Sequence, residues 1–134
     1  MSDSSKQTAL RGLAAADWLT TREPWHGFFE GDQIGANVTV LYFTQEQPGD
    51  GPGLHVHAYE EIFIIRRGRA RFTVGDAVIE AGEGDVVVGP AHVPHKFENL
   101  GPGPLETIDI HMSPRWVQVD LDDPADDRAS GVTA

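Results

Sequence analysis

From residue 35 onward the chain is a succession of short apolar segments with the character of β-strands. Residues 37–44 (NVTVLYFT) and 61–67 (EIFIIRR) are rich in β-branched and aromatic side chains, which favour strands. Further strands are predicted at 69–74, 77–80, 85–88, 95–99 and 105–112, separated by turns rich in glycine, proline, asparagine and aspartate. No long helical pattern lies between them, so the segments predict an all-β sandwich or small barrel.

The two ends of the chain have different patterns. Residues 1–23 show a weak helical spacing of Leu10, Leu13 and Leu19, which Pro24 ends, and this predicts a short helix or ordered arm. Five aspartates crowd the stretch from 120 to 127, which predicts a frayed acidic tail. We therefore expect an N-terminal arm at 1–34, a barrel at 35–119 and a flexible tail at 120–134.

Length and charge narrow the classes of function. The chain of 134 residues is long enough for one domain. Its 10 basic and 21 acidic residues give a net charge of −11, which argues against nucleic acid and anionic membranes as partners. No stretch reaches the roughly 20 apolar residues that span a bilayer, and the start lacks a signal-like apolar run, so we expect a cytoplasmic protein.

The candidate chemistry lies in histidines. The chain has no cysteine and six histidines, so any metal must be held by imidazoles and carboxylates. His55 and His57 project to one side of a strand because side chains alternate between its faces. Glu61 begins the next apolar strand, where burial of its charge requires a partner, and His95 opens a later strand. Three imidazoles and one carboxylate favour Fe, Mn, Ni, Co or Zn over Ca or Mg, and six-coordination would leave two positions open for chemistry.

These residues resemble the two motifs of the cupin superfamily. The first motif reads Gly, five residues, His-x-His, three residues, Glu, six residues, Gly, and its five positions are matched by Gly49, His55, His57, Glu61 and Gly68. The second reads Gly, five residues, Pro-x-Gly, two residues, His, three residues, Asn, and here it is Gly84, Pro90, His95 and Asn99. One position departs from it, because His92 stands where the family has glycine.

The resemblance implies a jelly-roll barrel (a double-stranded β-helix), often dimeric, with a metal inside. In metal-binding cupins the matching residues are the ligands, which implies His55, His57, Glu61 and His95 for one divalent transition metal. A homodimer that acts on a small-molecule substrate is therefore expected. A dioxygenase-type oxidoreductase is the favoured activity. A metal-dependent isomerase or cyclase, a non-catalytic module that binds a metal or small ligand, and a metal-free sugar-modifying cupin remain the alternatives.

Other residues have both a functional and a structural interpretation. His111, Tyr42 and His92 are weak candidates for catalysis, and an exposed or satisfied histidine, core packing and a surface turn, respectively, are the favoured interpretations. Glu60 is expected to face solvent, opposite to Glu61, and His26 to pack the N-terminal segment. The barrel interior is expected to contain Phe63, Ile65, Phe72, Val74 and Phe97. The segment 108–116 is expected either to cover the pocket or dimer seam, or to pack the C-terminal end.

Overall fold

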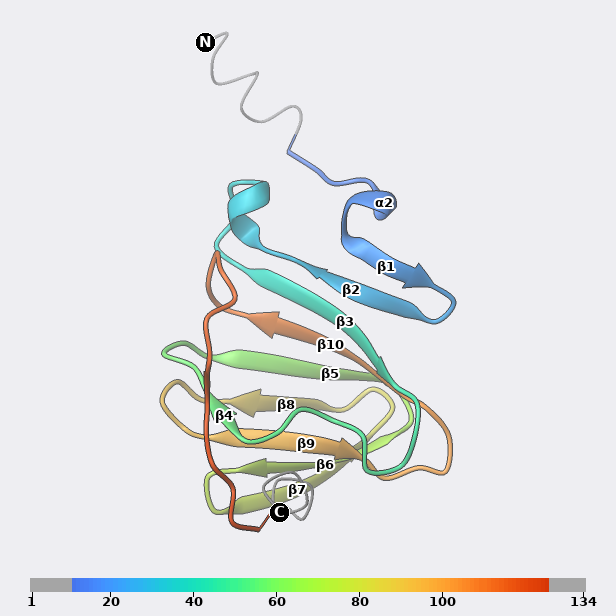
Figure 1. Cartoon of the computed structure of the whole chain (residues 1–134), viewed down its shortest axis with the longest axis vertical. Helices are drawn as coiled ribbons and strands as arrows, with labels where there is room; N and C mark the ends of the chain where they lie inside the picture. The colour runs from blue at the N-terminus through green and yellow to red at the C-terminus, as the bar shows by residue number, and fades with distance from the viewer. Residues whose placement is uncertain (1–10, 126–134) are drawn as a thin grey trace, which may run out of the picture.

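The computed structural model describes residues 11–125, and Figure 1 shows their arrangement. The elements in chain order are α2 (Ala15–Trp18), β1 (Leu19–Arg22), β2 (Trp25–Phe29), the 3-10 turn η1 (Gly31–Gln33), β3 (Thr39–Gln45), β4 (His55–Val56), β5 (Glu61–Arg67), β6 (Arg69–Val74), β7 (Ala77–Gly82), β8 (Val86–Gly89), β9 (His95–Asn99), β10 (Leu105–His111) and β11 (Val119–Asp120). No helix among these residues is long and apolar enough to cross a membrane.

The strands form two antiparallel sheets. One sheet has six strands in the order β1-β2-β3-β10-β5-β8, and the other has five in the order β11-β4-β9-β6-β7. Neighbours in each sheet come from distant parts of the chain, as where β10 lies between β3 and β5. The expectation of an all-β jelly-roll barrel is confirmed.

The core lies between the two sheets. The cluster of buried apolar residues comprises Phe63, Ile65, Ala70, Phe72, Ala81, Val87, Phe97 and Leu105. Phe72 is in ring contact with Phe63 and Phe97, at centroid distances of 4.9 and 5.0 Å. Burial of each such side chain contributes roughly 1.5–3 kcal/mol. The predicted interior residues are confirmed, with Val74 partly buried at the edge of the cluster.

A glycine turn joins the sheets between β5 and β6. Gly68 has a φ of +91°, a left-handed conformation that residues with a Cβ rarely adopt. A Cβ at this position would lie 2.4 Å from the carbonyl oxygen of Pro104. Both the backbone conformation and the close approach therefore require glycine here.

Strand β10 has its polar face inside the barrel. Leu105, Thr107, Asp109 and His111 are buried on the inner face, whereas Ile108 and Ile110 face outward and are half-buried. Three of the four inner residues are polar, which reverses the usual order for a strand over a core. The inner face of β10 therefore supplies polar groups to the interior, and its outer face presents isoleucines.

The N-terminal segment differs from the sequence prediction. The helix covers only Ala15–Trp18, and Leu19–Arg22 and Trp25–Phe29 form a hairpin that joins the six-stranded sheet through pairing of β2 with β3. The short helix expected within residues 1–23 covers only Ala15–Trp18 among the described residues, because Leu19–Arg22 pair with β2 as a strand instead. Of the predicted tail, residues 126–134 lie outside the described residues, as do residues 1–10 of the arm.

Candidate metal centre

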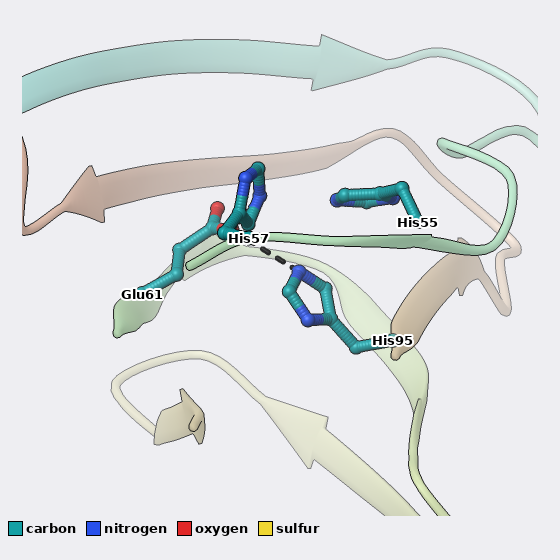
Figure 2. A group of neighbouring side chains, drawn as sticks. All are labelled: His55, His57, Glu61 and His95. Atoms are coloured by element: carbon teal, nitrogen blue, oxygen red, sulfur yellow. Dashed lines mark hydrogen bonds and ion pairs between the residues drawn. The ribbon is translucent and has the colours of Figure 1, made fainter. Parts of the chain in front are cut away.

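Four buried side chains converge inside the barrel. One ligand atom from each of His55, His57, Glu61 and His95 lies within 4.8 Å of the other three (Figure 2). His55 and His95 are directly paired across β4 and β9, and Glu61 enters from the first position of β5. Two neighbouring strands of one sheet and the facing sheet thus supply the cluster.

The backbone orients the three clustered imidazoles. Nδ1 of His55 and of His57 each lies 2.7 Å from a carbonyl oxygen, that of Gly53 and that of Val117. Nδ1 of His95 lies 3.3 Å from the Val93 carbonyl. Because a carbonyl only accepts, these contacts suit the tautomer with the proton on Nδ1, in which each Nε2 can present a lone pair to a metal. This is how histidine ligands of protein metal sites are commonly held.

The Glu61 carboxylate contacts two of the clustered histidines. Its Oε1 lies 3.1 Å from Nε2 of His57 and 3.2 Å from Nε2 of His95. Burial alone would raise the pKa of Glu61, but the imidazoles of His111, His57 and His95, each about 3 Å from one of its oxygens, hold that pKa well below its usual range. Glu61 is therefore ionised, as a metal ligand must be.

The donor set and spacing fit a transition metal. An ion with ligand bonds of about 2.1 Å places adjacent donors about 3.0 Å apart and opposite donors about 4.2 Å apart. The Glu61–His57 and Glu61–His95 separations are close to the first value. Nε2 of His57 is buried without a hydrogen-bond partner in the described part of the chain, a costly arrangement that a metal would satisfy. Burial also lowers the pKa of His55, which favours the neutral imidazole that binds metals.

His111 contacts the other oxygen of the same carboxylate. Its Nε2 lies 3.0 Å from Oε2 of Glu61, and its Nδ1 lies 2.7 Å from the hydroxyl of Tyr59. The Tyr59 hydroxyl also donates to the Val117 carbonyl at 2.9 Å, and Nε2–H of His111 can donate to Glu61. His111 is thus directed as a donor to the carboxylate, whereas the three clustered histidines present lone pairs.

A cavity of about 350 Å³ opens beside the cluster. It is lined by His26, Leu41, Phe43, Gln45, Gly51, Pro52, His55, Glu61, Phe63, Phe97, Asp109, His111, Trp116 and Gln118. The lining is largely aromatic and aliphatic and contains neither lysine nor arginine. A small organic molecule would therefore meet apolar walls, a few neutral hydrogen-bonding groups and the metal ligands.

Asp109 is a buried carboxyl group that lines this cavity. It is 2% exposed, and its neighbours in register are Leu41 on β3 and Phe63 on β5. Its Oδ1 has no hydrogen-bond partner among residues 11–125. Burial, together with the nearby charge of Glu61, raises the pKa of Asp109 well above its usual value. Asp109 therefore offers the cavity a carboxyl group that favours the neutral form.

Comparison with known proteins decides the family. The cupin domain family matches residues 42–111, more than half of the chain. The chain is a cupin. Both motifs that suggested this family lie inside or close to the matched range.

Several relatives of this cupin are described. XanB, the xanthan biosynthesis protein of Xanthomonas campestris, is 30% identical over 106 residues, which are 78% of this chain and 22% of XanB. The uncharacterised protein MJ1618 of Methanocaldococcus jannaschii is 39% identical over 56 residues, 41% of this chain and 45% of that protein. The chain thus spans less than half the length of these curated relatives.

Solved structures share the fold. Bacillus subtilis oxalate decarboxylase, described with Mn(II) centres, aligns with a TM-score of 0.65 at 24% identity over 72% of this chain and 28% of that chain. The Streptococcus pyogenes protein SPY1581, of unknown function, aligns with a TM-score of 0.53 at 20% identity over 60% of this chain and 68% of that chain. At these identities the comparison shows the fold alone.

The three weak catalytic candidates of this cupin lie in different places relative to the cavity. His111 lies in the cavity, but Tyr42 faces outward on β3, where its hydroxyl donates to Glu106 at 3.3 Å. His92 is exposed in the turn before β9 with a φ of +65°, a left-handed conformation that favours glycine. Glu60 is exposed, as expected. The structure therefore places one of the three candidates beside the metal cluster.

Other residues of the centre had no motif to mark them. His26, expected only to pack the N-terminal segment, also lines the cavity and stacks on Phe43 at 4.4 Å. Trp116 lines the cavity as well, so the segment after β10 takes part in covering the pocket, one of its two expected roles. Tyr59 and Asp109 also went unrecognised, because neither residue type nor spacing signals a partner from another strand.

Proposed function

We propose that this cupin is an enzyme that binds one divalent transition metal and acts on a small organic molecule, with dioxygenase-type oxidation as the favoured reaction. The observation that carries the proposal is the directed set of donors at the wall of a cavity. Three Nε2 lone pairs and one ionised carboxylate point to one place. A metal held there would supply Lewis-acid activation of substrate, or oxygen activation if it is Fe(II).

Residues around the metal centre have different proposed roles. Glu61 is held by His111, which fixes one carboxylate oxygen and leaves the other directed to the cluster. Phe43 and Trp116 supply flat apolar surface that excludes water and packs against a ring or alkyl group. Oδ1 of Asp109 has no hydrogen-bond partner among residues 11–125 and can bond a substrate group. These groups bind and orient the substrate.

The charge of the cavity favours a substrate other than a dicarboxylate. A divalent ion together with Glu61 would hold one net positive charge, and the lining contains neither lysine nor arginine. A second carboxylate on the substrate would be buried without a cationic partner, which is costly. We therefore propose a substrate that is uncharged apart from the group that meets the metal, and not the oxalate that names the decarboxylase neighbours.

A metal-dependent isomerase or cyclase is the second candidate. Asp109 and His111 both face the cavity and can hold or release a proton beside a substrate. Proton transfer next to a metal-bound carbonyl needs groups of this kind. This activity would require no oxygen, which separates it from the first candidate.

Oxygen uptake tests the proposed activity. Protein loaded with Fe(II) is mixed with a panel of neutral aromatic and hydroxylated or carbonyl-bearing molecules, with oxalate as the charged comparison. We expect uptake with a neutral compound, its loss in Glu61→Gln, and its retention in Glu60→Gln, whose carboxylate is exposed one residue away. Turnover of a neutral compound without oxygen would favour the isomerase or cyclase. Metal binding that changes only thermal stability, with no turnover by either route, would contradict an enzyme.

A further inference from the structure

Tyr59 contacts two histidines of the metal centre from the loop between β4 and β5. Its ring stacks on the ring of His57, with the centroids 4.8 Å apart and the planes 17° from parallel. Its hydroxyl lies 2.7 Å from Nδ1 of His111, the residue whose other ring nitrogen contacts Glu61. One side chain thus contacts a metal-ligand candidate and the histidine that contacts the carboxylate.

The Tyr59 hydroxyl also holds the segment that follows β10. We call residues 113–121 the C-terminal strap, which runs from the end of β10 along one side of the molecule to β4 (Figure 1). The hydroxyl donates to the carbonyl of Val117 at 2.9 Å and accepts from the N–H of Val117 at 3.1 Å. Both backbone groups of one strap residue are therefore bonded to one side chain.

The carbonyl of Val117 is shared between Tyr59 and a metal-ligand candidate. The same oxygen lies 2.7 Å from Nδ1 of His57, the contact that orients this imidazole. A backbone carbonyl has two lone pairs and can accept both hydrogen bonds. Tyr59 therefore acts on His57 in two ways, directly by stacking on its ring and indirectly by holding the carbonyl that accepts from it.

Val117 has little else to hold it in place. Its side chain is 57% exposed, and its hydrogen bonds within residues 11–125 are those with Tyr59 and His57. The next attachments of the C-terminal strap are the N–H of Trp116, which donates to Glu30, and the pairing of β11 with β4. Segments with exposed side chains and few buried contacts open locally at a low cost in free energy. The Tyr59 hydroxyl thus keeps the Val117 carbonyl against His57.

Tyr59 lies behind the ligand cluster rather than in the cavity. Within the described range 11–125, the residues that line the cavity include His111 and Trp116 but neither Tyr59 nor Val117. The hydroxyl of Tyr59 is occupied by Val117 and His111. Any effect of Tyr59 on the metal centre must therefore pass through the groups that it holds.

We propose that Tyr59 is a positioning residue of the metal centre, which fastens the C-terminal strap to the barrel and through it fixes the ring of His57. This inference rests on the proposed function, because it requires a metal held by His57 and Glu61. Groups that hydrogen-bond to metal ligands set their orientation, and the loss of one commonly lowers metal affinity about 10- to 100-fold. Tyr59 supports two such groups, the Val117 carbonyl and His111.

A pair of matched tyrosine variants tests this role. Tyr59→Phe removes the hydroxyl and keeps a ring that can stack on His57. Tyr42→Phe is the control, because it removes a hydroxyl that donates to Glu106 on the outer side of β3, away from the cluster. Circular dichroism checks that both variants fold.

Three measurements are made on each full-length protein, with Co(II) as the metal probe. Competition with a coloured chelator gives the Co(II) dissociation constant, and the visible absorption of the Co(II)-bound protein reports the geometry of its ligands. Amide hydrogen exchange of the metal-free protein reports how firmly the C-terminal strap is held. We expect Tyr59→Phe to raise the dissociation constant about 10-fold and to change the Co(II) spectrum. The amide of Val117 should exchange about 10-fold faster or more, because its acceptor is gone.

Tyr42→Phe should match wild type in all three measurements. If Tyr59→Phe binds Co(II) with the affinity and spectrum of wild type, the role of Tyr59 is overturned while the metal centre stands. Unchanged exchange at Val117, or an equal loss of affinity in Tyr42→Phe, would overturn that role as well. A folded wild-type protein that binds no Co(II) would contradict the metal centre of the proposed function, and the role of Tyr59 with it.

Discussion

Nε2 of His111 lies 3.0 Å from Oε2 of Glu61, whereas Nε2 of His57 and of His95 lie 3.1 and 3.2 Å from Oε1. The two oxygens of one buried carboxylate are thereby assigned to different partners. Oε1 faces the two imidazoles that present lone pairs, and Oε2 receives a hydrogen bond. His111 is thus a positioning residue, which holds Glu61 in one orientation.

Substitution of His111 tests this role. We expect His111→Ala to weaken metal binding by about 10- to 100-fold, the usual effect of removing a partner of a metal ligand. His111→Gln should restore part of the affinity, because its amide can donate to Oε2 of Glu61. Competition with a coloured chelator measures the affinity. Equal affinity for wild type and His111→Ala would show that Glu61 needs no support from this side.

The buried carboxyl of Asp109 predicts an unusual dependence of stability on pH. Its pKa is raised above the unfolded value of 3.8 by burial, so the folded protein retains a proton that the unfolded chain releases. This group therefore makes folding less favourable as the pH rises from 3.8 towards the folded pKa. We expect Asp109→Asn to raise the melting temperature of metal-free protein at neutral pH.

The gain from Asp109→Asn should shrink as the pH falls and vanish near pH 3.8, where both forms of the protein bind the proton. Thermal unfolding of the two proteins across this pH range, followed by circular dichroism, measures the difference. The same gain at every pH would mean that shape rather than charge causes it. A loss of stability at neutral pH would contradict a neutral Asp109.

His92 predicts a gain from glycine. Its φ of +65° strains any residue with a Cβ, and its side chain is exposed in a turn. His92→Gly should raise the free energy of unfolding by about 1 kcal/mol, since relief of strain exceeds the added freedom of the unfolded chain. His92→Ala keeps the Cβ and should give no gain. Denaturant titration distinguishes the two, and equal stability of both variants would rule out backbone strain as the cause.

The sequence predicted the ligand cluster because local spacing determines it. His55 and His57 share a face by strand alternation, and the family motif added Glu61 and His95. Strands, turns and the aromatic core followed from alternation in the same way. These features depend on neighbours within a few residues, or on a family pattern that already records the long-range contacts.

The sequence did not predict which face of strand β10 is buried. The sequence LETIDIH alternates clearly, but alternation does not state which set of side chains faces the interior. The sequence therefore left His111 a weak candidate for the site. The structure places Asp109 and His111 inside because β10 lies between β3 and β5, with Glu61 as the register partner of His111.

The prediction for the N-terminal segment was incomplete for a related reason. Leu13 and Leu19 belong to a helical spacing, but Leu19 pairs with Gly27 in the β1–β2 hairpin, which overrides this weak local preference. His26 enters the cavity only through that pairing. Trp116 likewise reaches the cavity from beyond β10, and its backbone N–H donates to Glu30 at 2.8 Å. Such contacts between distant segments have no signature in a single sequence.

Metal content tests the central claim most directly. Protein purified without an affinity tag or added metal is measured by plasma mass spectrometry, alongside Glu61→Gln and the matched variant Glu60→Gln. We predict about one equivalent of Fe, Mn, Ni, Co or Zn in wild type and in Glu60→Gln, and a clear loss in Glu61→Gln. A folded wild-type protein that contains no metal and takes up none on titration would contradict the metal centre.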